Sequence, residues 1–131
     1  MTLATPIPAC PCEPLAEAWL SRRGTTLAIE GVPLVRIAAV VGLPYYAYSA
    51  TALRDKYTAL AEAVAPHGVK VCFAVKANSN INVLAEFAAL GAGMDIVSGG
   101  EMARALAAGA PAERIIFSGV GKTGAEIRAA L

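Results

Sequence analysis

The chain has 131 residues, of which 56% are hydrophobic, and its formal net charge is +1. A chain of this length and composition can bury one hydrophobic core, so extended disorder is not expected. Acidic and basic residues are interspersed without a run of Lys or Arg, so the sequence carries no electrostatic footprint for nucleic acid or for an anionic membrane. A small-molecule site is therefore the better expectation.

The sequence predicts neither a secretory signal nor a membrane span. Residues 1–12 have no basic residue ahead of an apolar run and no convincing cleavage site, so we expect no secretory signal. The longest uncharged stretch, residues 37–53, is shorter than a membrane span and is interrupted by Gly42 and Pro44. We expect no membrane partner.

The three cysteines are Cys10, Cys12 and Cys72. A Cys-x-Cys pair with the single distant His67 lacks the spacing of metal ligands, so no metal is expected. Reduced thiols are typical of cytoplasmic proteins, and we expect a cytoplasmic location.

Residues 1–42 are expected to form an N-terminal arm and a lead-in segment. The apolar spacing over residues 13–23 predicts a short helix that ends at Gly24. Further on, β-prone pieces are predicted over residues 25–29 and 32–35, with one or two helical turns over 34–41.

From residue 43 onward, short apolar runs alternate with segments of helical spacing. This alternation is typical of β-α-β units in a parallel sheet, whose strands are buried on both faces and are continuously hydrophobic. The sequence predicts an α/β fold. Strands are expected over residues 45–48, 69–75, 94–97 and 114–117, and helices over 51–65, 80–90, 100–108 and from 123 onward.

A closed (β/α)8 barrel needs eight strands and about 250 residues. Residues 43–131 contain about four strand-helix units by this pattern and stop inside a helix at Leu131. We therefore expect the N-terminal half of a TIM barrel, truncated.

A polar residue follows each apolar run. In a barrel, the carboxyl ends of the strands form the face where the chemistry is done. A serine directly after a strand is also the usual N-cap of the next helix, and we expect the serines in this set to act as caps. The set is Ser49, Lys76, Ser98 and Ser118.

Lys76 differs from the serines because it comes directly after an apolar run with no acidic residue nearby in sequence. A lysine amine at such a place can be partly desolvated, which favours the neutral, nucleophilic form that reacts with an aldehyde cofactor. Position alone also allows an ordinary solvated lysine.

Three blocks of sequence resemble the diaminopimelate decarboxylase family at matching spacing. They are AVKANSN at residues 74–80, GAGMDIVSGGE at 91–101 and RIIFSGVGKT at 114–123. The segments IEGVPL at 29–34 and GLPYYAY at 42–48 are also similar to the start of that family, so the resemblance covers residues 27–131. Leu43 departs from the family, which usually has Thr before the proline.

The resemblance implies a TIM barrel that binds pyridoxal phosphate (PLP) covalently through Lys76. It implies that an amino-acid substrate displaces Lys76 and loses its α-carboxylate as CO₂; the usual reaction of the family converts meso-diaminopimelate to L-lysine. Asp95 matches an acidic residue that lies beside the cofactor in related decarboxylases. As an alternative, Asp95 binds backbone amides of the next loop. Full-length family members are expected to be homodimers.

Other interpretations stay open. One is a PLP-binding barrel protein without catalysis, and another is an ornithine or arginine decarboxylase of the same fold. Alanine racemases fit less well, because Ser79 and Asn80 depart from their usual motif. A third is a fragment without activity, since the resemblance places the ring-stacking histidine, the glycine-rich phosphate loop and the substrate arginine beyond Leu131.

Two nucleotide-binding motifs are rejected. Residues 119–124 formally match G-x-G-x-x-G, but the chain ends before the acidic residue expected about 20 positions later. A P-loop would need glycine five residues before Gly121, where Ile116 stands.

Overall fold

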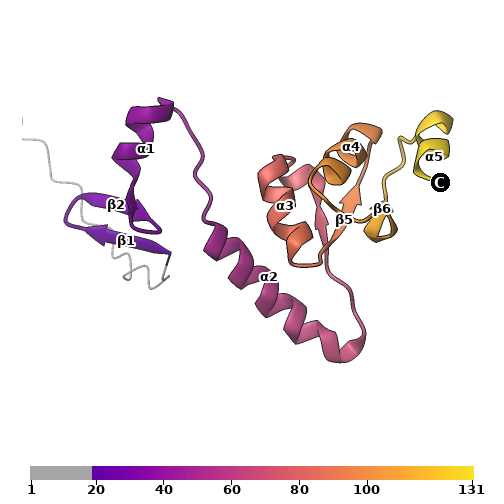
Figure 1. Ribbon diagram of the computed structural model, residues 1–131, viewed down its shortest axis with the longest axis horizontal. Coiled ribbons are helices and arrows are strands. Elements are labelled where there is room, and N and C mark those ends of the chain that lie inside the picture. The colour runs from indigo at the N-terminus through magenta and orange to yellow at the C-terminus, as the bar shows by residue number, and fades with distance from the viewer. Residues whose placement is uncertain (1–18) are drawn as a thin grey trace, which may run out of the picture. The chain divides into compact units, whose positions relative to one another are not determined.

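The computed structural model describes residues 19–131. The chain divides into two compact units, one ending at Ser49 and the other spanning Ala50–Leu131 (Figure 1). The predicted thiol state of Cys10 and Cys12 lies outside the described residues. Within residues 19–131, no helix is both long and apolar enough to cross a bilayer.

The N-terminal unit contains a three-stranded antiparallel sheet in the order β1-β2-β3. The turn between β2 and β3 consists of Glu30 and Gly31, which both have positive φ angles of 49° and 79°. Two-residue hairpins favour turns of this kind because their twist matches that of the strands. The elements are β1 (Leu20–Arg23), β2 (Thr26–Ile29), β3 (Val32–Pro33) and the helix α1 (Leu34–Val41).

The helix predicted over residues 13–23 is wrong where the structure describes it. Leu20–Arg23 forms β1, which pairs with β2 from Leu20 opposite Ile29 to Arg23 opposite Thr26. Gly24 does end the element, but with a φ of 60° in a hairpin turn. Pairing with β2 decides the conformation, which the apolar spacing of a single segment does not encode. The predicted β-pieces and the helical turns before Gly42 are confirmed.

The strand predicted over residues 45–48 is also wrong, because this segment forms neither a strand nor a helix. An apolar run becomes a strand only where a neighbour takes up its backbone hydrogen bonds. None of the strands described in residues 19–131 pairs with it. Side chains hold the segment instead: the Tyr45 hydroxyl donates to the Leu34 carbonyl at 2.8 Å, and the Ser49 hydroxyl donates to Glu30 Oε1 at 2.6 Å.

The C-terminal unit is an α/β structure with a parallel sheet in the order β4-β5-β6. The remaining predicted strands and helices are confirmed, with the strand over 69–75 shortened to three residues. The strands are β4 (Cys72–Ala74), β5 (Gly93–Ile96) and β6 (Ile115–Phe117). The helices are α2 (Ala50–Val64), α3 (Ile81–Ala89), α4 (Gly99–Ala107) and α5 (Gly124–Ala130), with short 3-10 turns η1 (Ala65–His67), η2 (Val75–Ala77) and η3 (Ala112–Arg114).

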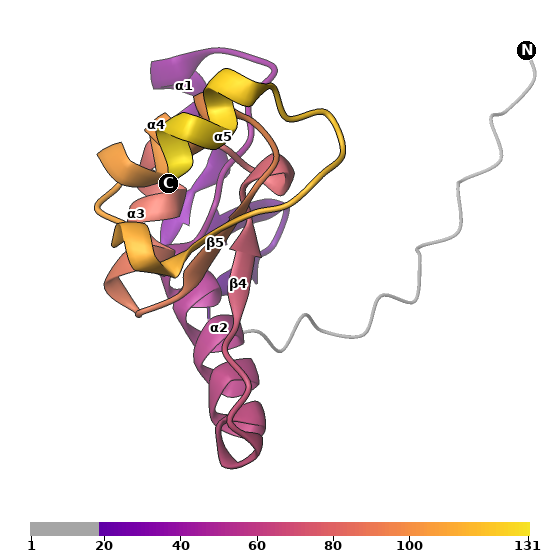
Figure 2. The same ribbon diagram turned by 90° about the vertical axis from the view of Figure 1, so that its right-hand side faces the viewer.

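The strands follow one another across the sheet in chain order, as in a barrel. Two successive crossovers of the same hand then place both connecting helices on one face of the sheet. The helices α3 and α4 indeed contact each other and β5, and they lie together on one side of the strands in Figure 2. A doubly wound sheet, in which the strand order reverses, would place helices on both faces.

The hydrophobic core of this unit lies between the sheet and its helices. Leu84, Met94 and Ile96 are fully buried there. Phe87 of α3 stacks on Phe73 of β4 with the ring centroids 4.2 Å apart. The core therefore fixes β5 firmly, since two of its three side chains are fully enclosed.

Asp95 stands between Met94 and Ile96 on β5. Because side chains alternate along a strand, Asp95 points to the face of the sheet opposite α3 and α4. Ile116 pairs with Asp95 in register and is 55% exposed. The helices of this unit thus leave that face of the sheet open.

Candidate active site

The strands β4, β5 and β6 are parallel, so their carboxyl ends meet at one edge of the sheet. Lys76 lies in η2, directly after β4, and Asp95 lies on β5. Ala74 pairs with Asp95 in the sheet, and Lys76 lies two residues after Ala74. The structure thus places Lys76 directly after one strand and Asp95 on the adjacent strand, both toward the carboxyl ends of the sheet.

Lys76 is exposed, whereas Val75 beside it is fully buried. Within residues 19–131, no hydrogen bond or ion pair engages the Lys76 amine. The loop after Lys76 is ordered by two asparagines. Asn78 Oδ1 accepts from the Asn80 amide at 3.0 Å, and Asn80 caps α3 by accepting from the Asn82 amide at 2.9 Å. An unengaged amine therefore stands on a well-ordered loop.

Asp95 is partly exposed as a residue, but its Oδ1 is buried and has no hydrogen-bond partner among the described residues. A buried carboxylate oxygen without a partner is costly, and such groups in a native structure call for an explanation. Two amides of the loop after β5 are engaged elsewhere: Val97 N donates to Glu101 Oε2, and Gly99 N donates to Glu126 Oε1, both at 2.8 Å. The unpartnered oxygen makes Asp95 a candidate for a ligand contact.

The predicted serine caps have different outcomes. Ser98 caps α4 by accepting from the Glu101 amide at 3.2 Å, as predicted. Ser118 does not cap α5, because Thr123 does so. The Ser118 hydroxyl instead donates to the Ile96 carbonyl at 3.4 Å, which ties the end of β6 to β5. The turn between β6 and α5 is long enough for a later residue to become the cap.

Glu126 is a residue of this edge that the sequence interpretation missed. Its Oε1 accepts from the Gly99 amide, and its Oε2 accepts from the amide and hydroxyl of Thr123 at 2.9 and 2.8 Å. These hydrogen bonds, led by the one from Gly99, lower the pKa of Glu126 to about 2. The spacing Thr-x-x-Glu was a detectable capping-box signal, but nothing local predicts the bond to Gly99.

The Glu126→Gln variant is expected to be less stable than the wild-type chain at neutral pH. The folded-state pKa of about 2 lies below the ordinary value of 4.5, so this carboxylate contributes its stabilisation above pH 4.5 and loses it as the pH falls through 2. Urea unfolding over a pH series should show that the free energies of unfolding of the two proteins become equal in acid. Glu62→Gln on α2 is the matched control. A difference in free energy of unfolding between wild type and Glu126→Gln that stayed constant at every pH would contradict the lowered pKa of Glu126.

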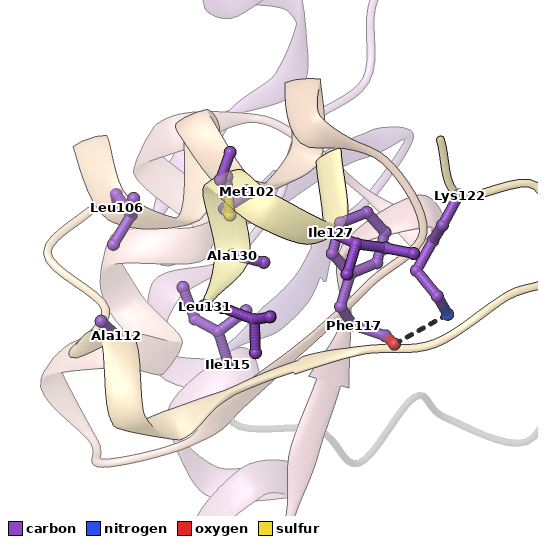
Figure 3. Close-up of a pocket in the computed structure, with 10 residues that line it drawn as sticks. Met102, Leu106, Ala112, Ile115, Phe117, Lys122, Ile127, Ala130 and Leu131 are labelled. Atoms are coloured by element: carbon purple, nitrogen blue, oxygen red, sulfur yellow. Dashed lines mark hydrogen bonds between the residues drawn. The ribbon is translucent and has the colours of Figure 1, made fainter. Parts of the chain in front are cut away.

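In the loop over residues 119–124, the Lys122 side chain hydrogen-bonds to backbone carbonyls just before it in the chain. The Lys122 ammonium donates to the carbonyls of Phe117, Ser118 and Gly119 at 3.1, 3.2 and 2.7 Å, and it lies 5.2 Å from the centroid of the Phe117 ring. Figure 3 shows the hydrogen bond from Lys122 to the Phe117 carbonyl at the margin of a cavity. The Lys122 ammonium is thus engaged by the backbone of this loop.

That cavity, of about 420 Å³, lies between α4, β6 and α5. Its lining is apolar apart from Lys122, whose ammonium is already bound by carbonyls. It lies on the helix side of the sheet, whereas Asp95 faces the other side. The side chains drawn in Figure 3 include Met102, Leu106, Ile115, Phe117, Ile127 and Leu131.

A second cavity, of about 510 Å³, lies at the opposite end of the strands from Lys76. Lys70, Cys72 and Arg114 contribute to its lining, and the Cys72 thiol has no disulfide partner among residues 19–131. Neither cavity contains Lys76 or Asp95, so the candidate site is the open carboxyl edge of the sheet.

Comparison with known proteins provides independent information. The family model described as "Pyridoxal-dependent decarboxylase, pyridoxal binding domain" matches residues 50–131. Diaminopimelate decarboxylase of Pseudomonas fluorescens is 53% identical over 109 residues, which is 83% of this chain and 26% of that protein. The Neisseria meningitidis enzyme of the same name is 52% identical over 106 residues, covering 81% of this chain and 26% of that protein.

Solved structures agree with the sequence matches. A crystal structure titled as diaminopimelate decarboxylase from M. jannaschii in co-complex with L-lysine aligns with a TM-score of 0.80 and 29% identity, covering 86% of this chain and 27% of that one. The Helicobacter pylori enzyme complexed with L-lysine aligns with a TM-score of 0.67 and 39% identity, covering 74% and 25%. The chain spans about a quarter of the length of the curated relatives it matches.

Proposed function

Since the chain belongs to the pyridoxal-dependent decarboxylases through their pyridoxal-binding domain, we propose that it carries the cofactor lysine of such an enzyme at Lys76. The observation that carries the proposal is the pairing of an unengaged amine after β4 with an unpartnered carboxylate oxygen on β5. The cofactor of the family is pyridoxal phosphate. The predicted resemblance and the α/β fold class of a PLP-binding TIM barrel are confirmed.

The proposed reaction is the decarboxylation of meso-diaminopimelate to L-lysine. Its support is the name shared by the relatives at about half identity and the L-lysine present in two of the structures that resemble this chain. The family model covers pyridoxal-dependent decarboxylases in general, so an ornithine or arginine substrate is the alternative. The substrate in either case is a small amino acid.

The residues at the candidate site fit PLP. Lys76 supplies a primary amine for the aldehyde, and Asp95 Oδ1 supplies an acceptor that lacks a partner among residues 19–131. When bound, the cofactor acts as an electron sink for the bond broken at the substrate α-carbon. Lys76 Nζ would bind the cofactor, and Asp95 Oδ1 would accept a hydrogen bond and orient the groups around Nζ.

The N-terminus of α4 is a poor place for the cofactor phosphate. Helix N-termini commonly bind phosphate through their free amides. Here the Glu126 carboxylate accepts from Gly99 N, the Glu101 carboxylate accepts from Val97 N, and Ser98 takes the Glu101 amide. Two carboxylates at this end would also repel an anion. We therefore propose that other parts of a complete site hold the phosphate.

Three further properties are proposed from the family resemblance and the sequence. A cytoplasmic location is supported by the free thiol of Cys72, since reduced cysteines are typical of that compartment. A homodimer is proposed for a full-length protein of this family. The division into an N-terminal segment of residues 1–42 and a partial barrel over 43–131 is supported by the described antiparallel strands, which end before residue 43, whereas the compact units divide after Ser49.

The proposal is tested by trapping the adduct. The purified chain is incubated with PLP and reduced with borohydride, and the phosphopyridoxyl group is located by peptide mass spectrometry. We expect label at Lys76 in clear excess over Lys56, Lys70 and Lys122, and labelling spread evenly over these lysines would contradict the proposal. Product analysis with meso-diaminopimelate, ornithine and arginine then separates the substrate alternatives.

The Asp95→Asn variant is expected to weaken cofactor binding while leaving Lys76 able to react. Loss of one hydrogen bond to a charged group corresponds to roughly tenfold weaker binding. The free chain should be at least as stable, because the buried, unpartnered oxygen no longer belongs to a carboxylate. PLP titration by absorbance and urea unfolding measure the two effects. Unchanged affinity together with lower stability would show that Asp95 is structural.

A further inference from the structure

The loop that carries Lys76 is anchored on both sides of the lysine. Val75 precedes it and is fully buried in the core. Ser79 follows it and receives two hydrogen bonds from Arg104 of α4: Nη1 donates to Ser79 Oγ at 3.1 Å and to the Ser79 carbonyl at 3.3 Å. Lys76 thus lies between the buried Val75 and Ser79, and we call the contact of Ser79 with Arg104 the tether.

The tether comes from a different β-α unit. The side-chain oxygens of Asn78 and Asn80 accept hydrogen bonds within the loop and the first turn of α3. For the part of the chain that the structure describes, Arg104 is the only side chain from another helix or strand that hydrogen-bonds to residues 76–80. The helix α4 itself begins directly after β5, the strand of Asp95. Arg104 therefore links the lysine loop to the helix that follows the aspartate strand.

We propose that Arg104 is a positioning residue for the cofactor lysine, acting through Ser79. The inference rests on the proposed role of Lys76. A long lysine side chain reacts efficiently only if its backbone is held in place, because each additional loop conformation lowers the fraction of molecules in which the amine is in position to react. The two hydrogen bonds reduce that freedom without any contact between Arg104 and the cofactor.

The test compares Arg104→Ala, Ser79→Ala and the double variant by two measurements. The first is the fraction of Lys76 labelled by PLP at a limiting concentration, and the second is hydrogen-deuterium exchange of the peptide spanning residues 76–80. We expect Arg104→Ala to lower labelling about threefold, which is at the low end of what a hydrogen bond contributes because this contact is exposed. The double variant should lose no more than Arg104→Ala alone, because both residues act through one contact.

Arg54→Ala is the matched control. Arg54 is also an exposed arginine that links two helices, through Glu86 at 2.8 and 3.0 Å. It should leave both measurements at residues 76–80 unchanged, and Arg104→Lys, which keeps a charged donor, should restore part of the labelling.

The outcomes separate the two proposals. The positioning role would be overturned if Arg104→Ala showed the same labelling and exchange as the wild-type chain. It would also be overturned if Arg54→Ala lost as much labelling of Lys76 as Arg104→Ala. Faster exchange in Arg104→Ala without selective labelling of Lys76 in the wild-type chain would support the tether as a structural contact and overturn both the positioning of a cofactor lysine and the proposed function. Selective wild-type labelling with no effect of Arg104→Ala would remove only the positioning role.

Discussion

The Lys76→Ala variant is expected to form no borohydride-stable PLP adduct at the carboxyl edge of the sheet. An alanine has no amine to react with the aldehyde, so the loss should be complete rather than partial. Lys76 is exposed, and a surface substitution of this kind changes the free energy of unfolding by about 0.5 kcal/mol or less. Mass spectrometry after reduction measures the adduct, and urea unfolding verifies the fold.

Lys70→Ala is the control for this experiment. Lys70 is another exposed lysine of the same unit, but it precedes β4 and lines the cavity at the other end of the strands. Its loss should leave the Lys76 adduct intact. A selective adduct that persists in Lys76→Ala would show that the cofactor lysine lies elsewhere.

The Leu84→Ala variant is expected to have the largest effect on stability. Leu84 is fully buried between α3 and the sheet, and truncation of such a leucine costs about 2–5 kcal/mol from lost burial and the cavity left behind. This is a large part of the ~5–15 kcal/mol that stabilises a typical domain. Urea unfolding followed by circular dichroism should show a much lower midpoint.

Leu60→Ala provides the same chemical change at a solvent-exposed site. Leu60 lies on α2 and is 52% exposed, so its truncation should change the free energy of unfolding by only about 0.5 kcal/mol. If the two variants unfolded at the same urea concentration, the core described here would not be the source of stability.

Local patterns in the sequence predicted most of the C-terminal unit. The helical spacing over residues 51–65 and 80–90 agrees with α2 and α3, because an amphipathic helix repeats its apolar face every few residues. The cap at Ser98 likewise depends on residues three positions apart. The position of Lys76 directly after β4 was predictable for the same reason, since the end of an apolar run is a local feature.

Only the tertiary structure decided which segments pair. Leu20–Arg23 is a strand because β2 lies beside it, and residues 45–48 are not a strand because no described strand pairs with them. Two hydrogen bonds join residues that are distant in sequence: the one from Gly99 to Glu126 and the one from Arg104 to Ser79. The lack of a partner for Asp95 Oδ1 likewise depends on which residues surround it in the fold. Sequence periodicity encodes how one segment presents its side chains, whereas a hydrogen bond between segments exists only once packing has placed its donor and acceptor together.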